Sequence, residues 1–127
     1  MDKVELQERL TMFAIRVIKM VDSMPSTVSG QAIARQIIRS GTSPSANYRA
    51  ACVAKSDKDF LNKLKMVEEE LDETSHWLDI IIRSEILPPT RIHSLYQECC
   101  ELLSIIVKSI LTVKNRMKME EIEKLKK

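Results

Sequence analysis

The scarcity of turn-forming residues constrains this chain more than any other feature of its sequence. Only two glycines and four prolines occur in 127 residues, too few for the many tight turns of an all-β fold. Apolar residues instead recur three and four positions apart over long stretches, as on one face of an amphipathic helix. The chain is long enough to bury a hydrophobic core in one domain. The sequence therefore predicts a single all-α domain.

Four segments carry this helical spacing, over residues of about 4–23, 28–54, 57–84 and 89–120. Proline marks two of the boundaries, at Pro25 and at Pro88–Pro89, because the residue before a proline is biased away from helical angles. Ser26 or Ser29 can cap the second helix and Ser56 the third. Outside the second helix, the expected core residues are Leu6, Leu10, Phe13, Ala14, Val17 and Val21; Phe60, Leu64, Val67, Leu71, Ser75, Leu78 and Ile81 or Ile82; and Ile92, Leu95, Cys99, Leu102, Ile106, Ile110, Val113 and Met117. Short connections between long helices indicate an up-and-down four-helix bundle.

The second helix contains Gly41 and Pro44 at its centre. Proline removes a backbone donor and collides with the carbonyl four residues earlier, so a kink is expected at residues 41–44. Ser43 before Pro44 is also a suitable helix start, which leaves open one kinked helix or two short helices almost in line. The spacing of Ala46, Ala50 and Ala54 predicts that this face packs against a neighbouring helix.

The residues around this proline also carry a family resemblance. The run Arg39–Ser43 followed by Ala46, Asn47 and Tyr48 is distinctive, and the pattern continues through Ser56, Lys58, Asp59, Phe60, Lys63, Leu64, Glu70, Glu73, Thr74, Trp77 and Leu78. The chain thereby resembles the bacterial four-helix-bundle proteins encoded by ribosomal RNA intervening sequences. It departs from the usual pattern at Pro44–Ser45 and at Ala50–Ala51.

This resemblance implies a non-enzymatic homo-oligomer, a pentamer, that is related to accessory proteins of diversity-generating retroelements. Those proteins bind nucleic acid, so RNA, DNA or a nucleic-acid enzyme such as a reverse transcriptase are the partners implied here, besides further copies of the chain itself.

Apolar residues outside the expected core independently favour self-association. They are Met66, Trp77 and Ile80 on the third helix and Cys100, Leu103, Ile105, Val107 and Leu111 on the fourth. Apolar surface beyond what a core requires usually marks an association site. The alternative is a wide core-facing stripe with partly covered edges.

Charge is unevenly distributed, although the formal net charge is only +2. Residues 28–56 contain Arg35, Arg39, Arg49 and Lys55 and no acid, whereas residues 57–87 contain nine acids against four bases. A basic surface repeated around an oligomer can bind nucleic-acid phosphates. The alternative is that the basic second helix pairs with the acidic third helix, within or between subunits. An oligomeric scaffold for a protein partner is then the competing function.

No pattern typical of catalysis, a cofactor or a metal is present. His76 and His93 lie on different helices without metal-ligand spacing, and Cys99 and Cys100 are expected to pack as small apolar groups. Near the expected kink, the amide of Asn47 can bond the hydroxyls of Thr42 or Ser43, so Ser43, Pro44, Asn47 and Tyr48 are interpreted as a structural motif. The charged N-terminus and the three cysteines favour a cytoplasmic location away from the membrane.

Overall fold

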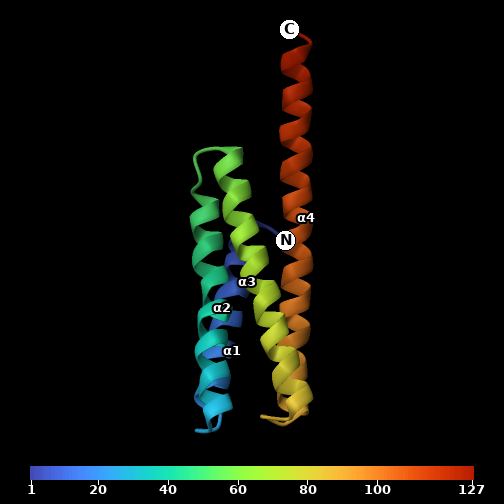
Figure 1. Ribbon diagram of the computed structural model, residues 1–127. Coiled ribbons are helices and arrows are strands. Elements are labelled where there is room, and N and C mark those ends of the chain that lie inside the picture. Colours follow the sequence, from blue (N-terminus) through green and yellow to red (C-terminus); the bar gives the residue numbers. More distant parts are fainter.

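A computed structural model describes the whole chain, residues 1–127, as four antiparallel helices (Figure 1). They are α1 (Lys3–Asp22), α2 (Val28–Cys52), α3 (Asp57–Ser84) and α4 (Pro89–Leu125). Each successive pair of helices packs together, and α4 also touches α1. The all-α four-helix bundle predicted from the sequence is confirmed, and the bounds of α3 match the prediction.

Side-chain caps fix three of the helix starts. The side chain of Asp2 accepts from the Glu5 amide at the start of α1, and that of Ser56 accepts from the Asp59 amide at the start of α3. The cap of α2 is Thr27, so the expectation of Ser26 or Ser29 is wrong. Each cap satisfies an amide that has no partner inside its helix.

The proline in α2 does not break the helix. Residues Val28–Cys52 form one uninterrupted helix that contains Pro44, and no second segment begins at Ser43. The alternative of two short helices is therefore wrong. The helix continues without interruption through residues 41–44, where the kink was expected. Pro44 is buried, so its ring contributes to packing at the position where it removes one backbone donor.

Gly41 lets α1 and α2 approach closely near this proline. A Cβ atom at Gly41 would lie 2.8 Å and 2.9 Å from the two methyl carbons of Val17, which is itself fully buried. No side chain fits there unless α1 moves away. The small residues of α2 therefore serve helix contact, but on a different face from the one predicted.

The buried face of α2 is formed by Gly30, Ile37, Ser40, Gly41, Pro44, Tyr48 and Ala51. Ala46 is exposed and Ala50 is only half-buried, so the predicted alanine face is wrong within the subunit. The second half of the helix is rotated from the predicted phase, because small residues such as Ser40, Gly41 and Ala51 make much of its contact with the neighbouring helices. Such residues leave no clear apolar stripe in the sequence.

Helix α4 extends beyond the rest of the bundle. It continues to Leu125, five residues past the predicted end, and its C-terminal part rises past the ends of the other helices (Figure 1). Every residue from Lys118 onward is exposed. We call residues 118–127 the overhang.

Candidate nucleic-acid interface

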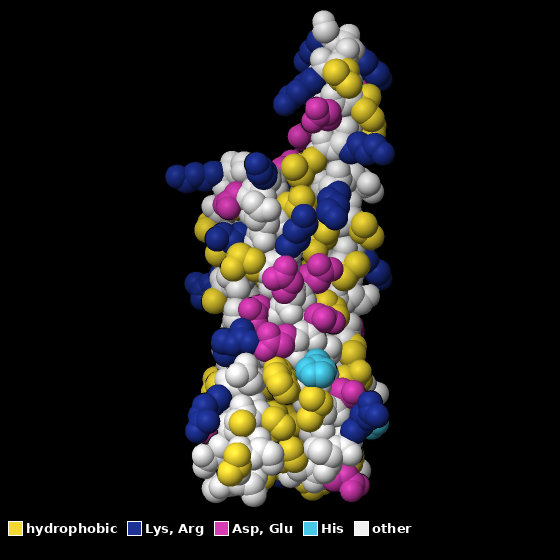
Figure 2. All heavy atoms as spheres, in the orientation of Figure 1, with side chains coloured by type: hydrophobic (Ala, Val, Ile, Leu, Met, Phe, Trp, Pro, Cys, Tyr) yellow, Lys and Arg dark blue, Asp and Glu magenta, His cyan; other side chains and the backbone are white.

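The outward face of α2 and the turn that follows it carry three unpaired cations. Arg35, Arg49 and Lys55 are exposed, and none of them forms an ion pair. Arg35 and Arg49 are fourteen residues apart, which places them on similar sides of the helix and about 21 Å apart along its axis. Figure 2 shows Lys and Arg side chains along this edge of the molecule. We call Arg35, Arg49 and Lys55 the α2 cation row.

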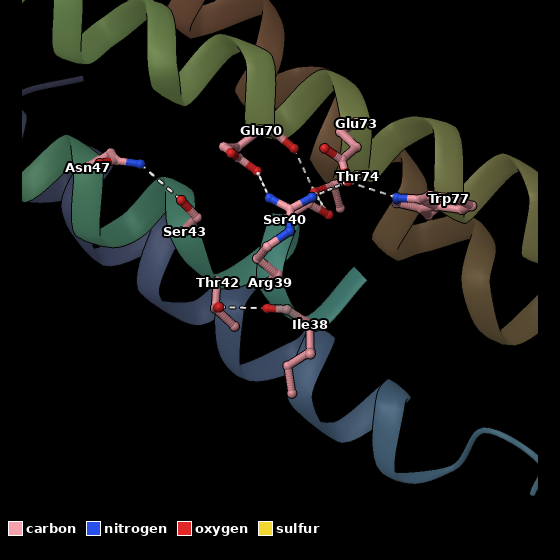
Figure 3. Close-up of polar contacts among 10 residues, drawn as sticks. All are labelled: Ile38, Arg39, Ser40, Thr42, Ser43, Asn47, Glu70, Glu73, Thr74 and Trp77. Atoms are coloured by element: carbon pink, nitrogen blue, oxygen red, sulfur yellow. Dashed lines mark hydrogen bonds and ion pairs between the residues drawn. The ribbon is translucent and has the colours of Figure 1, made fainter. Parts of the chain in front are cut away.

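Arg39, the fourth candidate, is engaged by acidic residues of α3. Its guanidinium bonds Glu70 at 2.9 Å and also pairs with Glu73 (Figure 3). The Glu73 carboxylate accepts a further hydrogen bond from the Trp77 indole nitrogen at 3.0 Å. The predicted pairing of basic α2 with acidic α3 therefore exists within the subunit at this residue. Arg39 does not belong with the free cations.

The electrostatics of this cluster follow from the same contacts. The hydrogen bond from Arg39 holds the pKa of Glu73 below its usual value, and the bond from Trp77 adds to this effect. The pKa of Arg39 is raised in turn, chiefly by its bond to Glu73. Both groups are therefore charged at neutral pH, and the pair ties α2 to α3 instead of offering Arg39 to a ligand.

Behind Arg39, two hydroxyls connect the helices inside the core. Ser40 and Thr74 are fully buried with their oxygens 2.9 Å apart, and Thr74 Oγ1 lies 2.7 Å from the Glu70 carbonyl oxygen (Figure 3). Since each hydroxyl has one proton, Thr74 donates to the carbonyl and accepts from Ser40. This buried bond fixes the register of α2 against α3, because burying either hydroxyl alone is costly.

The predicted motif around Pro44 has local packing contacts in the structure. The Asn47 amide nitrogen donates to the Ser43 hydroxyl at 2.9 Å (Figure 3), one of the two expected bonds. Tyr48 is 4% exposed, and burial raises the pKa of its hydroxyl. These residues lie within α2 and make contacts that stabilise the bundle.

Three interhelical ion pairs were not predicted from the sequence. Arg116 of α4 makes a bidentate contact with Asp57 at the start of α3, and the shorter of its two hydrogen bonds joins Nη2 to Oδ1 at 2.7 Å. Arg9 of α1 contacts Glu98 at 2.5 Å and Glu101 at 3.2 Å on α4. They join residues that are 59 to 92 positions apart in the sequence, so no local sequence pattern predicts them.

Other candidate chemistry is sparse. No group of three or more His, Cys, Asp or Glu side chains is arranged to hold a metal ion. Cys99 is buried, whereas Cys100 is exposed, so the expectation that both pack as apolar groups is wrong for Cys100. None of the four helices combines the length and apolarity that crossing a membrane requires.

The fold and this surface define a class of protein: a four-helix bundle with one helix edge rich in cations. The chain belongs to the family of 23S rRNA-intervening sequence proteins, whose family model matches residues 2–108. This confirms the resemblance that the sequence suggested. No match to this chain was found among curated proteins.

A solved structure agrees with this assignment. The chain is similar to a protein of unknown function from the S23 ribosomal protein family of Bacteroides thetaiotaomicron VPI-5482, known from a crystal structure at 1.70 Å resolution. The two share 30% sequence identity with a TM-score of 0.77, over 83% of this chain and 97% of the other.

Proposed function

We propose that this protein is a non-enzymatic homo-oligomer that binds the phosphate backbone of RNA or DNA through the α2 cation row. The observation that carries this proposal is that Arg35, Arg49 and Lys55 are exposed without acidic partners, in a stretch of 29 residues that has no acid. Lysine and arginine bind phosphates by releasing counterions, and such contacts do not depend on base sequence.

One cation row is a weak binding site, so the proposal includes self-association. Exposed apolar side chains lie on two different surfaces, with Met12, Ile15 and Ile18 on α1 and Met66 and Val107 on α3 and α4. Contact between two unlike surfaces is head-to-tail and closes into a ring if the rotation allows. A pentameric ring, as the family resemblance implies, would present five cation rows to one nucleic-acid chain.

Fluorescence anisotropy with labelled single-stranded RNA and DNA tests the binding. We expect binding at low salt that is insensitive to sequence and is lost toward physiological salt. The double variant Arg35→Glu/Arg49→Glu should abolish binding while leaving the oligomer intact. The control is Arg83→Glu/Arg91→Glu, which changes the charge equally on exposed side chains of α3 and α4 and should retain most of the binding.

The second candidate function is a scaffold for a protein, such as a nucleic-acid enzyme of the reverse transcriptase kind. The exposed apolar residues on α1 favour it, because they exceed what the bundle core uses. A wild-type protein that binds neither RNA nor DNA at low salt would contradict the nucleic-acid proposal and leave the scaffold in its place.

A further inference from the structure

The overhang of α4 is a helix without a partner inside the subunit. Its side chains from Lys118 onward are all exposed, including Ile122 at 38% and Leu125 at 83%. A helical segment of this length is only marginally stable in water without tertiary contacts. It also lies wholly outside residues 2–108, the part that matches the family. A contact that covers it would stabilise the helix.

A second apolar stripe runs along the outer side of α4 into the overhang. Its positions alternate in spacing by four and three residues, as in a coiled-coil seam. They are Leu111, Asn115, Lys118, Ile122 and Leu125. Ile122 follows the buried Val113 by nine residues, or two and a half turns, so the stripe lies opposite the bundle core. Figure 2 shows several apolar side chains, with Lys and Arg side chains among them, on the side of this protruding helix that faces away from the other helices.

We propose that this outer stripe binds the same stripe of a second copy of the chain, with the two helices antiparallel. Antiparallel pairing places Leu111 opposite Ile122 of the second copy at both ends of the overlap. Asn115 then faces Lys118 of the second copy, and the amide oxygen can accept from the ammonium group. Polar residues at such positions lower stability but select one register and orientation.

The charges beside the stripe favour the same arrangement. Lys114 and Glu121 flank the stripe on one side. Antiparallel pairing brings Lys114 of each copy opposite Glu121 of the other copy, which gives two attractive pairs. Parallel pairing would instead place Lys118 directly against Lys118. A second copy of this chain is therefore the partner whose charges match, and only in the antiparallel direction.

This pairing is distinct from ring formation. The overhang extends beyond the ends of α1, α2 and α3 (Figure 1). A neighbouring subunit that points in the same direction has its own α1, α2 and α3 at the same level, so the overhang also extends beyond the neighbour's three helices. Two rings joined through their overhangs would form a closed assembly with dihedral symmetry, in which several weak helix pairs act together.

Light scattering coupled to gel filtration tests the pairing on the full-length protein. A chain that ends at Met117 keeps Arg116 and its contact with Asp57 but loses Ile122 and Leu125. We expect its number of subunits to be half that of the full-length protein, with unchanged helical content of the bundle. Equal subunit numbers for the two proteins would overturn the proposal. A full-length dimer and a shortened monomer would uphold the pairing and contradict the ring.

Charge variants test the orientation. Lys114→Glu and Glu121→Lys each replace two attractive pairs with two repulsive ones, so each should raise the dissociation constant of pairing by about tenfold. The double variant Lys114→Glu/Glu121→Lys restores opposite charges and should recover pairing. Glu123→Lys, which lies away from the seam, is the control and should have little effect. If the double variant pairs no better than the single variants, the antiparallel arrangement is wrong.

Discussion

At the scale of single residues, the polar contacts between α2 and α3 decide how the bundle fits together. Ser40 bonds Thr74 in the core, and Arg39 bonds Glu70 and Glu73 at the edge. The sequence pointed to these residues through the family resemblance. It did not show that they meet, because the partners are 31 to 34 positions apart and the register between two helices is not visible in either one alone.

Replacing Thr74 with valine should lower the free energy of unfolding by about 1–3 kcal/mol, because the buried Ser40 hydroxyl loses its acceptor. Ser40→Ala alone should cost less, since Thr74 keeps its bond to the Glu70 carbonyl. Urea unfolding of both single variants and the double variant measures the coupling. Purely additive effects would mean that the two hydroxyls do not interact.

Acid should weaken the cluster around Glu73. The folded-state pKa of this carboxyl lies below its unfolded value, so its stabilising contribution is present at neutral pH and is lost as the pH falls through the folded pKa. The contribution is modest, because the side chain is 34% exposed. Unfolding measured from pH 7 to pH 3 should show a smaller loss of stability for Glu73→Gln than for wild type. An identical pH dependence would contradict the ion pair.

The cysteines should differ sharply in reactivity. Cys99 is fully buried, its thiol lies 3.3 Å from the Leu71 carbonyl oxygen, and burial raises its pKa to about 12. Cys100 is exposed. Because the thiolate is the reactive form, a thiol reagent at pH 8 should modify Cys100 and leave Cys99 until the protein unfolds. Mass spectrometry of peptides after labelling identifies the modified site, and early labelling of Cys99 would show that the core is open.

At the scale of helices, apolar spacing predicted most of the fold. Every fourth-helix residue expected in the core is buried except the half-buried Met117. In α3, the pattern was one residue off at two positions, where Leu61 and Thr74 are buried in place of Phe60 and Ser75. The predicted alanine face of α2 was wrong, because small residues at a close helix contact, such as Ser40 and Gly41, form much of the buried face. The length of α4 was underestimated because no proline or glycine ends it.

Gly41→Ala tests the close approach of α1 and α2. The added methyl group would overlap the side chain of Val17, so the variant should lose about 1–3 kcal/mol of stability through overpacking. Ala46→Leu is the matched control on the exposed side of α2 and should change stability by less than about 0.5 kcal/mol within the subunit. Thermal unfolding measures both, and a tolerated Gly41→Ala would mean that the two helices are further apart.

At the scale of the whole molecule, the free cations predicted for nucleic-acid binding lie along one edge. Of the four cations predicted for nucleic-acid binding, Arg39 is occupied by α3, and Arg35, Arg49 and Lys55 are free. Sequence alone identified the stretch but could not separate paired from unpaired cations. Acidic α3 lies directly beside this edge, so the proposed binding requires phosphates to reach α2 without contacting the carboxylates of α3.

The salt dependence of RNA binding tests the central claim most directly. Each phosphate neutralised on a single strand contributes a slope of about −0.7 to the logarithm of affinity against the logarithm of salt concentration. We expect a steep negative slope for the wild-type protein. The charge-neutralising variant Arg35→Gln/Arg49→Gln should have a slope that is shallower by at least about 1.4, the contribution of two phosphate contacts. Equal slopes for the two proteins, or no binding by wild type at low salt, would contradict the account.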